Sequence, residues 1–309
     1  MASDRLVIGS RGSKLALWQA NYARDRLKAR YAGLEVEVRV IKTLGDKVRD
    51  VALSKLGSKG IFTKELEEAI LSRKIDLAVH SLKDLPTKLP EGLVIGAVTE
   101  RIHTADCLVS REAVMLKNLT VGARIGTSSL RRKVQICAIR PDLEVKDLRG
   151  NLDTRLAKLE RGEFEAIVVA QAGLVRLGLE DRITEVFRPE VITPAAGQGA
   201  LAFEYRDGDR RTGELVSFLN HRRTELEIEA ERDFLRALGG GCQVPIGASA
   251  KLGDDRRLLL YGMISDLQGE RLMRDGIEDF PGARPGKMLA ERMLDSGGRE
   301  ILEEILGGE

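Results

Sequence analysis

Two successive strand-to-helix junctions near the middle of the chain constrain its fold more than any other feature. One is Gly126–Arg132 (GTSSLRR) and the other is Arg149–Arg155 (RGNLDTR), and each follows a strand-like segment and precedes a helical pattern. Ser128 or Ser129 can cap the first helix, because a serine hydroxyl accepts from first-turn amides. Neighbouring junctions of this kind meet at the carboxyl edge of a parallel sheet, where open α/β sheets bind ligands. The sequence therefore predicts an α/β fold with a ligand site at this edge.

The arginines of these junctions indicate a ligand that carries several carboxylates. Arg131 and Arg132 fall in the first turn of the predicted helix. The helix dipole disfavours cations there, by roughly 0.3 to 1 kcal/mol each, unless an anion offsets it. Guanidinium groups bind carboxylates bidentately and stay charged at every accessible pH. For any one arginine the alternative is a solvated or salt-bridged surface position, but the whole set favours an anion site.

The length of the chain predicts more than one domain. With 309 residues it exceeds the size at which a single hydrophobic core stops growing. Alternating strand and helix patterns predict a first α/β lobe from residues 1–99 and 200–220, and a second α/β lobe from residues 105–195. Residues 222–309 are predicted to form a small α+β domain. Because the chain would cross twice between the lobes, we expect a cleft that can open and close.

Composition excludes several classes of protein. The 50 basic and 48 acidic side chains give a net charge of +2, which does not favour a dedicated nucleic-acid binder. Three cysteines without paired spacing argue for a reducing compartment, and against a disulfide framework or a zinc site. We expect no metal. Neither an export signal nor an apolar run of membrane-spanning length is present, so a cytoplasmic protein without a membrane partner is expected.

Three further features are candidates for chemistry. Lys83 and Asp84 follow a predicted strand that ends at the same sheet edge, and a carboxylate there would have its acidity shifted by its neighbours. The polar segment 43–60 is either a functional lid or a solvated loop. Cys242 follows three glycines, which suits a thiol presented at a cleft, although a lone cysteine is more often a packing residue. The packing interpretation is preferred for Cys107 and Cys137.

Seven motifs in order resemble the porphobilinogen deaminase family, also called the hydroxymethylbilane synthase family, over nearly the whole chain. Any one of them is a weak signal, but the ordered set is highly specific. They are residues 8–13 (IGSRGS), 57–60 (GSKG) with Phe62, 76–86 (DLAVHSLKDLP), 126–132 (GTSSLRR), 148–151 (LRGN) with Thr154 and Arg155, 194–199 (PAAGQG), and 240–246 (GGCQVPI).

This resemblance implies both a fold and an activity. The first two lobes would be similar to type II periplasmic binding proteins. Members of the family join four porphobilinogen molecules head to tail, with release of ammonia, to give the linear tetrapyrrole hydroxymethylbilane. They do so on a dipyrromethane cofactor made from the substrate, bound through a thioether to the cysteine of the GGCQVP motif, here Cys242. The expected enzyme is a monomeric transferase of heme biosynthesis.

The resemblance also implies roles for individual residues. Asp84 matches the catalytic carboxylate, and Lys55 and Lys59 lie in the segment expected to form the lid. Residues that match the cofactor seat are Ser81, Lys83, Thr127, Ser129, Arg131, Arg132, Arg149, Gly150 and Arg155. Positions associated with the incoming substrate and the growing chain are matched by Arg11, Ser13, Gln19, Asn151, Arg155 and Arg176. Two departures from the family pattern, residues 101–105 and Gln171, bear on the hinge and on the placement of Arg176.

The chemistry of the reaction agrees with these residue types. Each porphobilinogen brings an acetate and a propionate, so every addition requires more cationic partners. Loss of ammonia leaves an azafulvenium cation, which a carboxylate such as Asp84 can stabilise while it moves protons. A lid would exclude water from that cation. Two alternatives remain: a bilobal protein that captures an anion without transforming it, and a phosphate or nucleic-acid enzyme that uses the helix N-termini.

Overall fold

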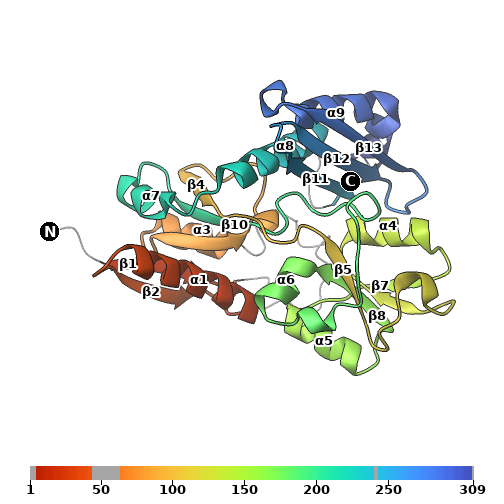
Figure 1. Cartoon of the computed structure of the whole chain (residues 1–309), viewed down its shortest axis with the longest axis horizontal. Helices are drawn as coiled ribbons and strands as arrows, with labels where there is room; N and C mark the ends of the chain where they lie inside the picture. Colours follow the sequence, from red (N-terminus) through yellow and green to blue (C-terminus); the bar gives the residue numbers. More distant parts are fainter. Residues whose placement is uncertain (1–4, 44–62, 240–242, 308–309) are drawn as a thin grey trace. The chain divides into compact units, whose positions relative to one another are not determined.

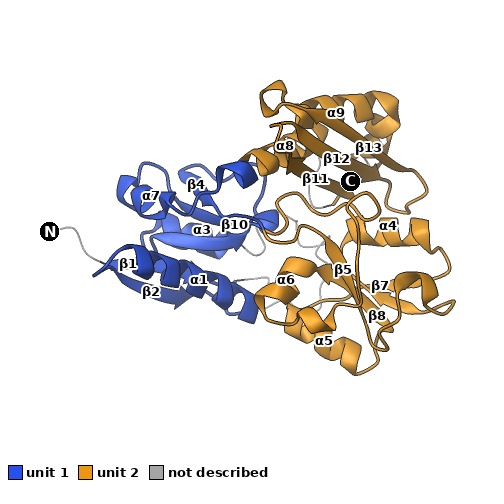
Figure 2. Ribbon diagram, in the orientation of Figure 1, with its two compact units in different colours: residues 1–101, 200–225 blue, residues 102–199, 226–309 orange. Residues whose placement is uncertain are grey.

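The computed structural model describes residues 5–43, 63–239 and 243–307. The chain divides into two compact units, Met1–Arg101 with Ala200–Glu225, and Ile102–Gly199 with Leu226–Glu309 (Figure 2). The chain therefore passes out of the first unit near residue 101 and returns to it at residue 200.

The first unit is an α/β lobe (Figure 1). Its sheet runs in the order β2-β1-β3-β10-β4, with β1 parallel to both β2 and β3, and β10 antiparallel to β3 and β4. The strands are β1 (Arg5–Ser10), β2 (Glu35–Val40), β3 (Leu77–Ser81), β4 (Leu93–Val98) and β10 (Leu201–Arg206), and the helices are α1 (Lys14–Arg30), α3 (Lys64–Leu71) and α7 (Arg210–Ser217).

Alternation along β1 and β3 builds an apolar layer on each face of this sheet. Leu6 and Ile8 of β1 pack with Ala20, Ala23 and Leu27 of α1 on one face. On the other face, Ala78 of β3 packs with Leu66 and Ile70 of α3. Side chains two residues apart in a strand share a face, so His80 of β3 faces α3 as Ala78 does.

The second unit contains another α/β sheet with the same order of parallel strands. It runs β7-β6-β8-β5-β9, where β6 is parallel to β7 and β8, and β5 is antiparallel to β8 and β9. Its elements are β5 (Asp106–Ser110), β6 (Arg124–Gly126), α4 (Leu130–Ile139), β7 (Glu144–Lys146), α5 (Leu152–Glu160), β8 (Ala166–Ala170), α6 (Gln171–Arg176) and β9 (Glu185–Val186). Each sheet thus receives a crossing strand, β10 or β5, in the fourth position of its order.

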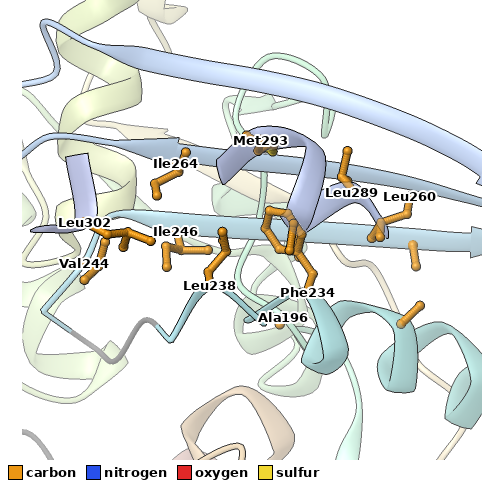
Figure 3. Close-up of a cluster of buried hydrophobic side chains, with 14 of the residues drawn as sticks. Ala196, Phe234, Leu238, Val244, Ile246, Leu260, Ile264, Leu289, Met293 and Leu302 are labelled. Carbon is orange, nitrogen blue, oxygen red and sulfur yellow. The ribbon is translucent and has the colours of Figure 1, made fainter. Parts of the chain in front are cut away.

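The same unit also holds an antiparallel sheet in the order β11-β12-β13. Phe234 of α8 packs with Leu289 and Met293 of α9 against Leu260 and Ile264 of β12 (Figure 3). The elements here are α8 (Arg222–Leu238), β11 (Ile246–Leu252), β12 (Leu258–Ser265), β13 (Leu272–Asp279), α9 (Pro285–Met293) and α10 (Arg299–Leu306). Short turns of helix are Leu82–Asp84, Leu116–Asn118, Glu180–Arg182, Pro281–Ala283 and Leu294–Gly298.

The predicted fold class is confirmed: two α/β sheets joined by a double crossover, and a small α+β region after them. The sequence made no pattern evident for α7. The compact unit that contains the second lobe also contains the C-terminal sheet. The division into three domains therefore stays a prediction.

Candidate active site

A small pocket in the first unit opens at the ends of β1 and β3. Its volume is about 60 Å³, and Arg11, Ser13, Gln19, Ser81 and Asp84 are among its lining residues. The chain leaves β3 through one turn of 3-10 helix, Leu82–Asp84, whose buried Leu82 donates its amide to Ala200 O at 3.1 Å. This anchored turn holds Asp84 at the pocket with its side chain exposed.

Side chains from α1 and β3 are joined beside Asp84. Ser13 caps α1, with its hydroxyl accepting from the amide of Ala16 at 3.3 Å. Gln19 is 3% exposed, and its Nε2 donates to Ser81 Oγ at 2.7 Å. Ser13 and Gln19, which were predicted to contact substrate, therefore share one pocket with Ser81, predicted for the cofactor, and with Asp84. Lys83 is half-buried in the same turn.

In the second unit, Arg131 and Arg132 lie in the first turn of α4 as predicted. Ser129 is the N-cap, and it accepts from the Arg132 amide at 3.4 Å. The two guanidinium groups are buried and share the carboxylate of Asp106, which is fully buried. Arg131 Nη1 lies 2.7 Å from Asp106 Oδ2, and Arg132 Nη2 lies 2.7 Å from Asp106 Oδ1. The anion that a cationic first turn requires is thus a side chain of the protein itself.

Further hydrogen bonds fix this cluster in place. Arg131 donates to Thr193 O at 2.6 Å, and Arg132 donates to Val168 O at 3.1 Å. Burial alone would raise the pKa of Asp106, but Arg131 and Arg132 outweigh it and hold that pKa well below its usual range. Two guanidinium charges against one carboxylate leave one positive charge in a buried place. Within the described residues, Arg132 Nε is buried without a hydrogen-bond partner, so it can donate to a ligand anion.

The second junction lies next to the first. The Thr127 amide donates to Lys146 O at 2.9 Å, and Ser128 Oγ donates to Leu148 O at 2.8 Å. Gly150 has a φ of +106°, and a Cβ there would lie 2.7 Å from Thr154 Cγ2, so the turn requires glycine.

Arg149 and Arg155 extend from this turn, and Arg176 lies beside Gly199, where the chain crosses back to the first unit. Arg155 Nε donates to Gly150 O at 2.8 Å, and Arg149 Nη2 lies 3.7 Å from Asp147 Oδ2. Arg176, at the end of α6, is buried and donates to Gly199 O at 2.7 Å. Asn151 is the exposed N-cap residue of α5, without a side-chain capping bond.

Cys242, Lys55 and Lys59 lie outside the described residues, so the thioether site and the lid stay predictions. The packing interpretation fits Cys107, which is fully buried and whose pKa burial raises to about 12. Burial also raises the pKa of Cys137. In the part of the chain that the structure describes, no group of histidine, cysteine or acidic side chains is arranged to hold a metal. None of the described helices combines the length and apolar character needed to cross a membrane.

Two residues of the arginine cluster were not found by sequence reasoning. Asp106 opens the strand that crosses into the second sheet, and Gln198 Nε2 donates to Asp106 Oδ1 at 2.8 Å and to Thr104 O at 2.7 Å. The cationic first turn of α4 signalled that some anion was needed. Which of the chain's acidic residues supplies it depends on tertiary structure, so the sequence pattern alone could not identify Asp106.

Two family models match the chain. Residues 6–214 match the model described as porphobilinogen deaminase, dipyromethane cofactor binding domain. Residues 225–295 match the model described as porphobilinogen deaminase, C-terminal domain.

Individual proteins agree with these matches. The porphobilinogen deaminase of Nitratidesulfovibrio vulgaris strain Hildenborough is 49% identical over 304 residues, which covers 97% of this chain and 96% of the relative. That of Moorella thermoacetica is 51% identical over 303 residues, with the same coverage of 97% and 96%. Among solved structures, the periplasmic VFT2 domain of Bordetella pertussis BvgS is similar over 69% of this chain and 86% of that one, with a TM-score of 0.42 and 14% identity. The chain belongs to the porphobilinogen deaminase family, and residues 6–214 correspond to its dipyrromethane cofactor binding domain.

Proposed function

We propose that this chain is a transferase that joins four porphobilinogen molecules head to tail, releasing ammonia, to form hydroxymethylbilane. The observation that carries the proposal is the pocket of the first unit, which brings Arg11, Ser13 and Gln19 together with Ser81 and Asp84. An acidic pyrrole needs a cation and hydroxyl or amide donors for its carboxylates, and a carboxylate for its pyrrole N–H. The pocket supplies each of these groups.

Asp84 is the proposed catalytic residue. It lines the pocket with Arg11, so a substrate held there through a carboxylate would bring its ring towards the Asp84 oxygens. An ionised carboxylate stabilises the azafulvenium that forms when ammonia leaves, because the two charges are opposite. It can also accept the proton that the attacked pyrrole carbon loses. Gln19 is fixed by its bond to Ser81, which reduces the entropy lost when substrate binds.

The cofactor seat is proposed for the second unit and for the turn after β3. The dipyrromethane, when bound through Cys242, supplies the free pyrrole carbon to which the first substrate unit is joined. The arginine cluster of α4 fits such a polyacid, since it carries one uncompensated positive charge and the unpartnered Arg132 Nε among the described residues. Further donors proposed for the cofactor carboxylates are Ser81, Lys83, Thr127, Ser129, Arg131, Arg149, Gly150 and Arg155. Asn151 and Arg176, together with Arg155, are proposed to hold the growing chain.

The remaining expectations are part of the same proposal. We expect a cytoplasmic, monomeric enzyme of tetrapyrrole synthesis whose partner is porphobilinogen, with no nucleic acid, membrane or metal involved. A third, C-terminal domain carrying Cys242 and a lid containing Lys55 and Lys59 are also proposed.

Turnover of porphobilinogen tests the activity. Purified protein incubated with porphobilinogen should release four ammonia molecules for each linear tetrapyrrole formed. Asp84→Asn should bind substrate without releasing ammonia at a comparable rate. If the wild-type protein binds porphobilinogen but leaves it intact, the chain captures an anion without transforming it, and the proposed activity is wrong.

A further inference from the structure

A buried cluster of ionisable side chains lies beneath the end of β3, on the face that packs on α3. His80 of β3 and Glu204 of β10 are diagonal neighbours, because His80 pairs with Ala202. His80 Nε2 lies 3.0 Å from Glu204 Oε2, and the two residues are 6% and 0% exposed. Glu67 of α3 is also buried, and the charges of both His80 and Glu204 act on it.

This cluster is poorly explained as a device for stability. The 3.0 Å contact between His80 Nε2 and Glu204 Oε2 lacks hydrogen-bond geometry, and neither atom has a hydrogen-bond partner among the described residues. The same holds for Glu204 Oε1 and Glu67 Oε1. Buried polar atoms without hydrogen bonds are costly, and native proteins have few of them. A buried ion pair that lacks supporting bonds adds little stability compared with apolar side chains of similar volume. The cluster therefore calls for a role in the chemistry.

Burial favours states of the cluster that carry no net charge. Two carboxylates and one imidazole are neutral together only when they carry two protons, and burial penalises any net charge. Burial raises the pKa of Glu67, and the negative charges of Glu204 and Glu68 raise it further, whereas Thr63 and His80 oppose the shift. The surroundings of Glu67 therefore favour its protonated form.

The cluster also reaches the proposed active site. His80 lines the same pocket as Asp84 and Arg11, and Thr63 at the start of α3 lines it too. Ser81, the residue after His80, is held by the Gln19 amide at 2.7 Å. Groups that share a polar pocket can exchange protons directly or through water.

We propose that His80, Glu204 and Glu67 form a proton relay that restores Asp84 after each addition, an inference that rests on the proposed function. In each addition the C–N bond of the protonated aminomethyl group breaks and ammonia leaves. One C–C bond then forms to the pyrrole carbon, and that carbon loses its proton to Asp84. The relay takes this proton from Asp84 and passes it to the ammonia released by C–N cleavage, which stays in the pocket until this point and then leaves as ammonium. Protons and charge balance over the cycle, with no other reactant.

Substitutions that remove titration but keep side-chain size test the relay in the cofactor-loaded enzyme. Glu204→Gln and His80→Gln should lower kcat by about tenfold to a hundredfold, less than the 10²–10⁴ of a direct acid–base residue. KM for porphobilinogen should change less than twofold. The solvent deuterium isotope effect on kcat should increase, and the pH profile of kcat should lose the limb that depends on the relay. Glu67→Gln should show the same kinetic changes with smaller magnitude. This variant should still fold.

Asp266→Asn is the matched control, because Asp266 is a buried carboxylate that accepts from the amides of Gly269, Glu270 and Arg271 and lines no part of the pocket. It should lose stability without altering the pH profile or the isotope effect. If the relay variants change only in proportion to their stability, as this control does, the cluster is structural and the relay is wrong.

Infrared titration of the resting wild-type enzyme tests the cluster separately from turnover. We expect the carboxylic acid band of a protonated side chain to persist to a higher pH than that of an exposed glutamate, and to be lost in Glu67→Gln. Absence of that band in the wild-type protein contradicts the relay even if the enzyme turns over porphobilinogen. The band in a protein that consumes no porphobilinogen contradicts the proposed function instead.

Discussion

The first and second α/β sheets begin helices in the same way but place their arginines differently. Ser13 caps α1 and Ser129 caps α4, each after the second strand of its sheet order. Arg11 precedes its cap and lines an open pocket. Arg131 and Arg132 follow theirs and share buried Asp106. One topology thus supports either a cation that lines a pocket, or a pair of cations held by an internal carboxylate.

This difference has an electrostatic reason. The backbone N–H groups of the first turn are unsatisfied, so the helix dipole acts most strongly there. A cation before the N-cap lies outside that turn. Cations within that turn need an anion close by, and in a buried place they also need hydrogen bonds. Asp106 and the carbonyls of Thr193 and Val168 meet both needs. The result is a pair of buried guanidinium groups fixed by internal partners.

The strongest test of the comparison acts on the first unit. Asp84→Asn should lower turnover of porphobilinogen by at least about 10²–10⁴-fold, because an amide neither opposes the cationic intermediate nor accepts a proton. The fold should be unaffected, since the side chain is exposed. Single-turnover kinetics and mass spectrometry would measure this. Turnover close to that of the wild type would remove Asp84 from the chemistry.

In the second unit the corresponding change should affect the fold first. Asp106→Asn leaves two buried guanidinium groups without their shared carboxylate, which should lower the free energy of unfolding by about 3–5 kcal/mol. Denaturant titration at neutral pH measures it. A loss below about 1 kcal/mol would mean that the arginines do not depend on Asp106, and that the two units do not differ in the way described.

The pH dependence of stability sharpens this prediction. The folded pKa of Asp106 lies below its ordinary value of 3.8, so its contribution is fully present above that value and is lost as pH falls below it. The Asp106→Asn variant should lack this acid-induced loss. Unfolding measured between neutral pH and pH 2 in both proteins would show it, and parallel curves would contradict the assignment.

Glu67 should show the opposite sign, and a smaller effect. Its folded pKa is raised mainly by burial, so the folded state holds the proton more tightly, and stability falls as pH rises from 4.5 through the folded pKa. Glu67→Gln cannot ionise and should not show this fall, which makes it at least as stable as the wild type at neutral pH. Thermal unfolding against pH measures the difference. A variant less stable than the wild type at neutral pH would contradict the assignment.

Arg149→Ala should have the smallest effect on the fold. Arg149 lies 3.7 Å from Asp147, whose side chain is 72% exposed, and such pairs contribute about 0–1 kcal/mol. A decrease in cofactor retention without loss of stability would support a role for Arg149 in binding carboxylates. Unchanged retention would remove it from the proposed cofactor seat.

Much of the fold was predictable because local patterns determine it. The Ser129 cap, the continuous apolar run of β8 and the amphipathic α8 follow from residues close together in sequence. The partners of buried charges were not predictable in this way. Asp106 lies 25 residues before Arg131, and Glu204 lies 124 residues after His80, so both pairs exist only through the crossing strands β5 and β10. Sequence motifs predicted which residues form the site, whereas the structure shows what holds the described ones in place.

The central claim is that the chain carries an acidic primer linked covalently to Cys242. Intact-mass measurement of the purified wild-type protein and of Cys242→Ser tests it most directly. We predict a wild-type mass that exceeds the mass of the sequence by two linked pyrrole units, and a Cys242→Ser mass equal to that of its bare chain. A wild-type protein with the mass of the bare chain, or the same added mass on Cys107 or Cys137, would contradict the account.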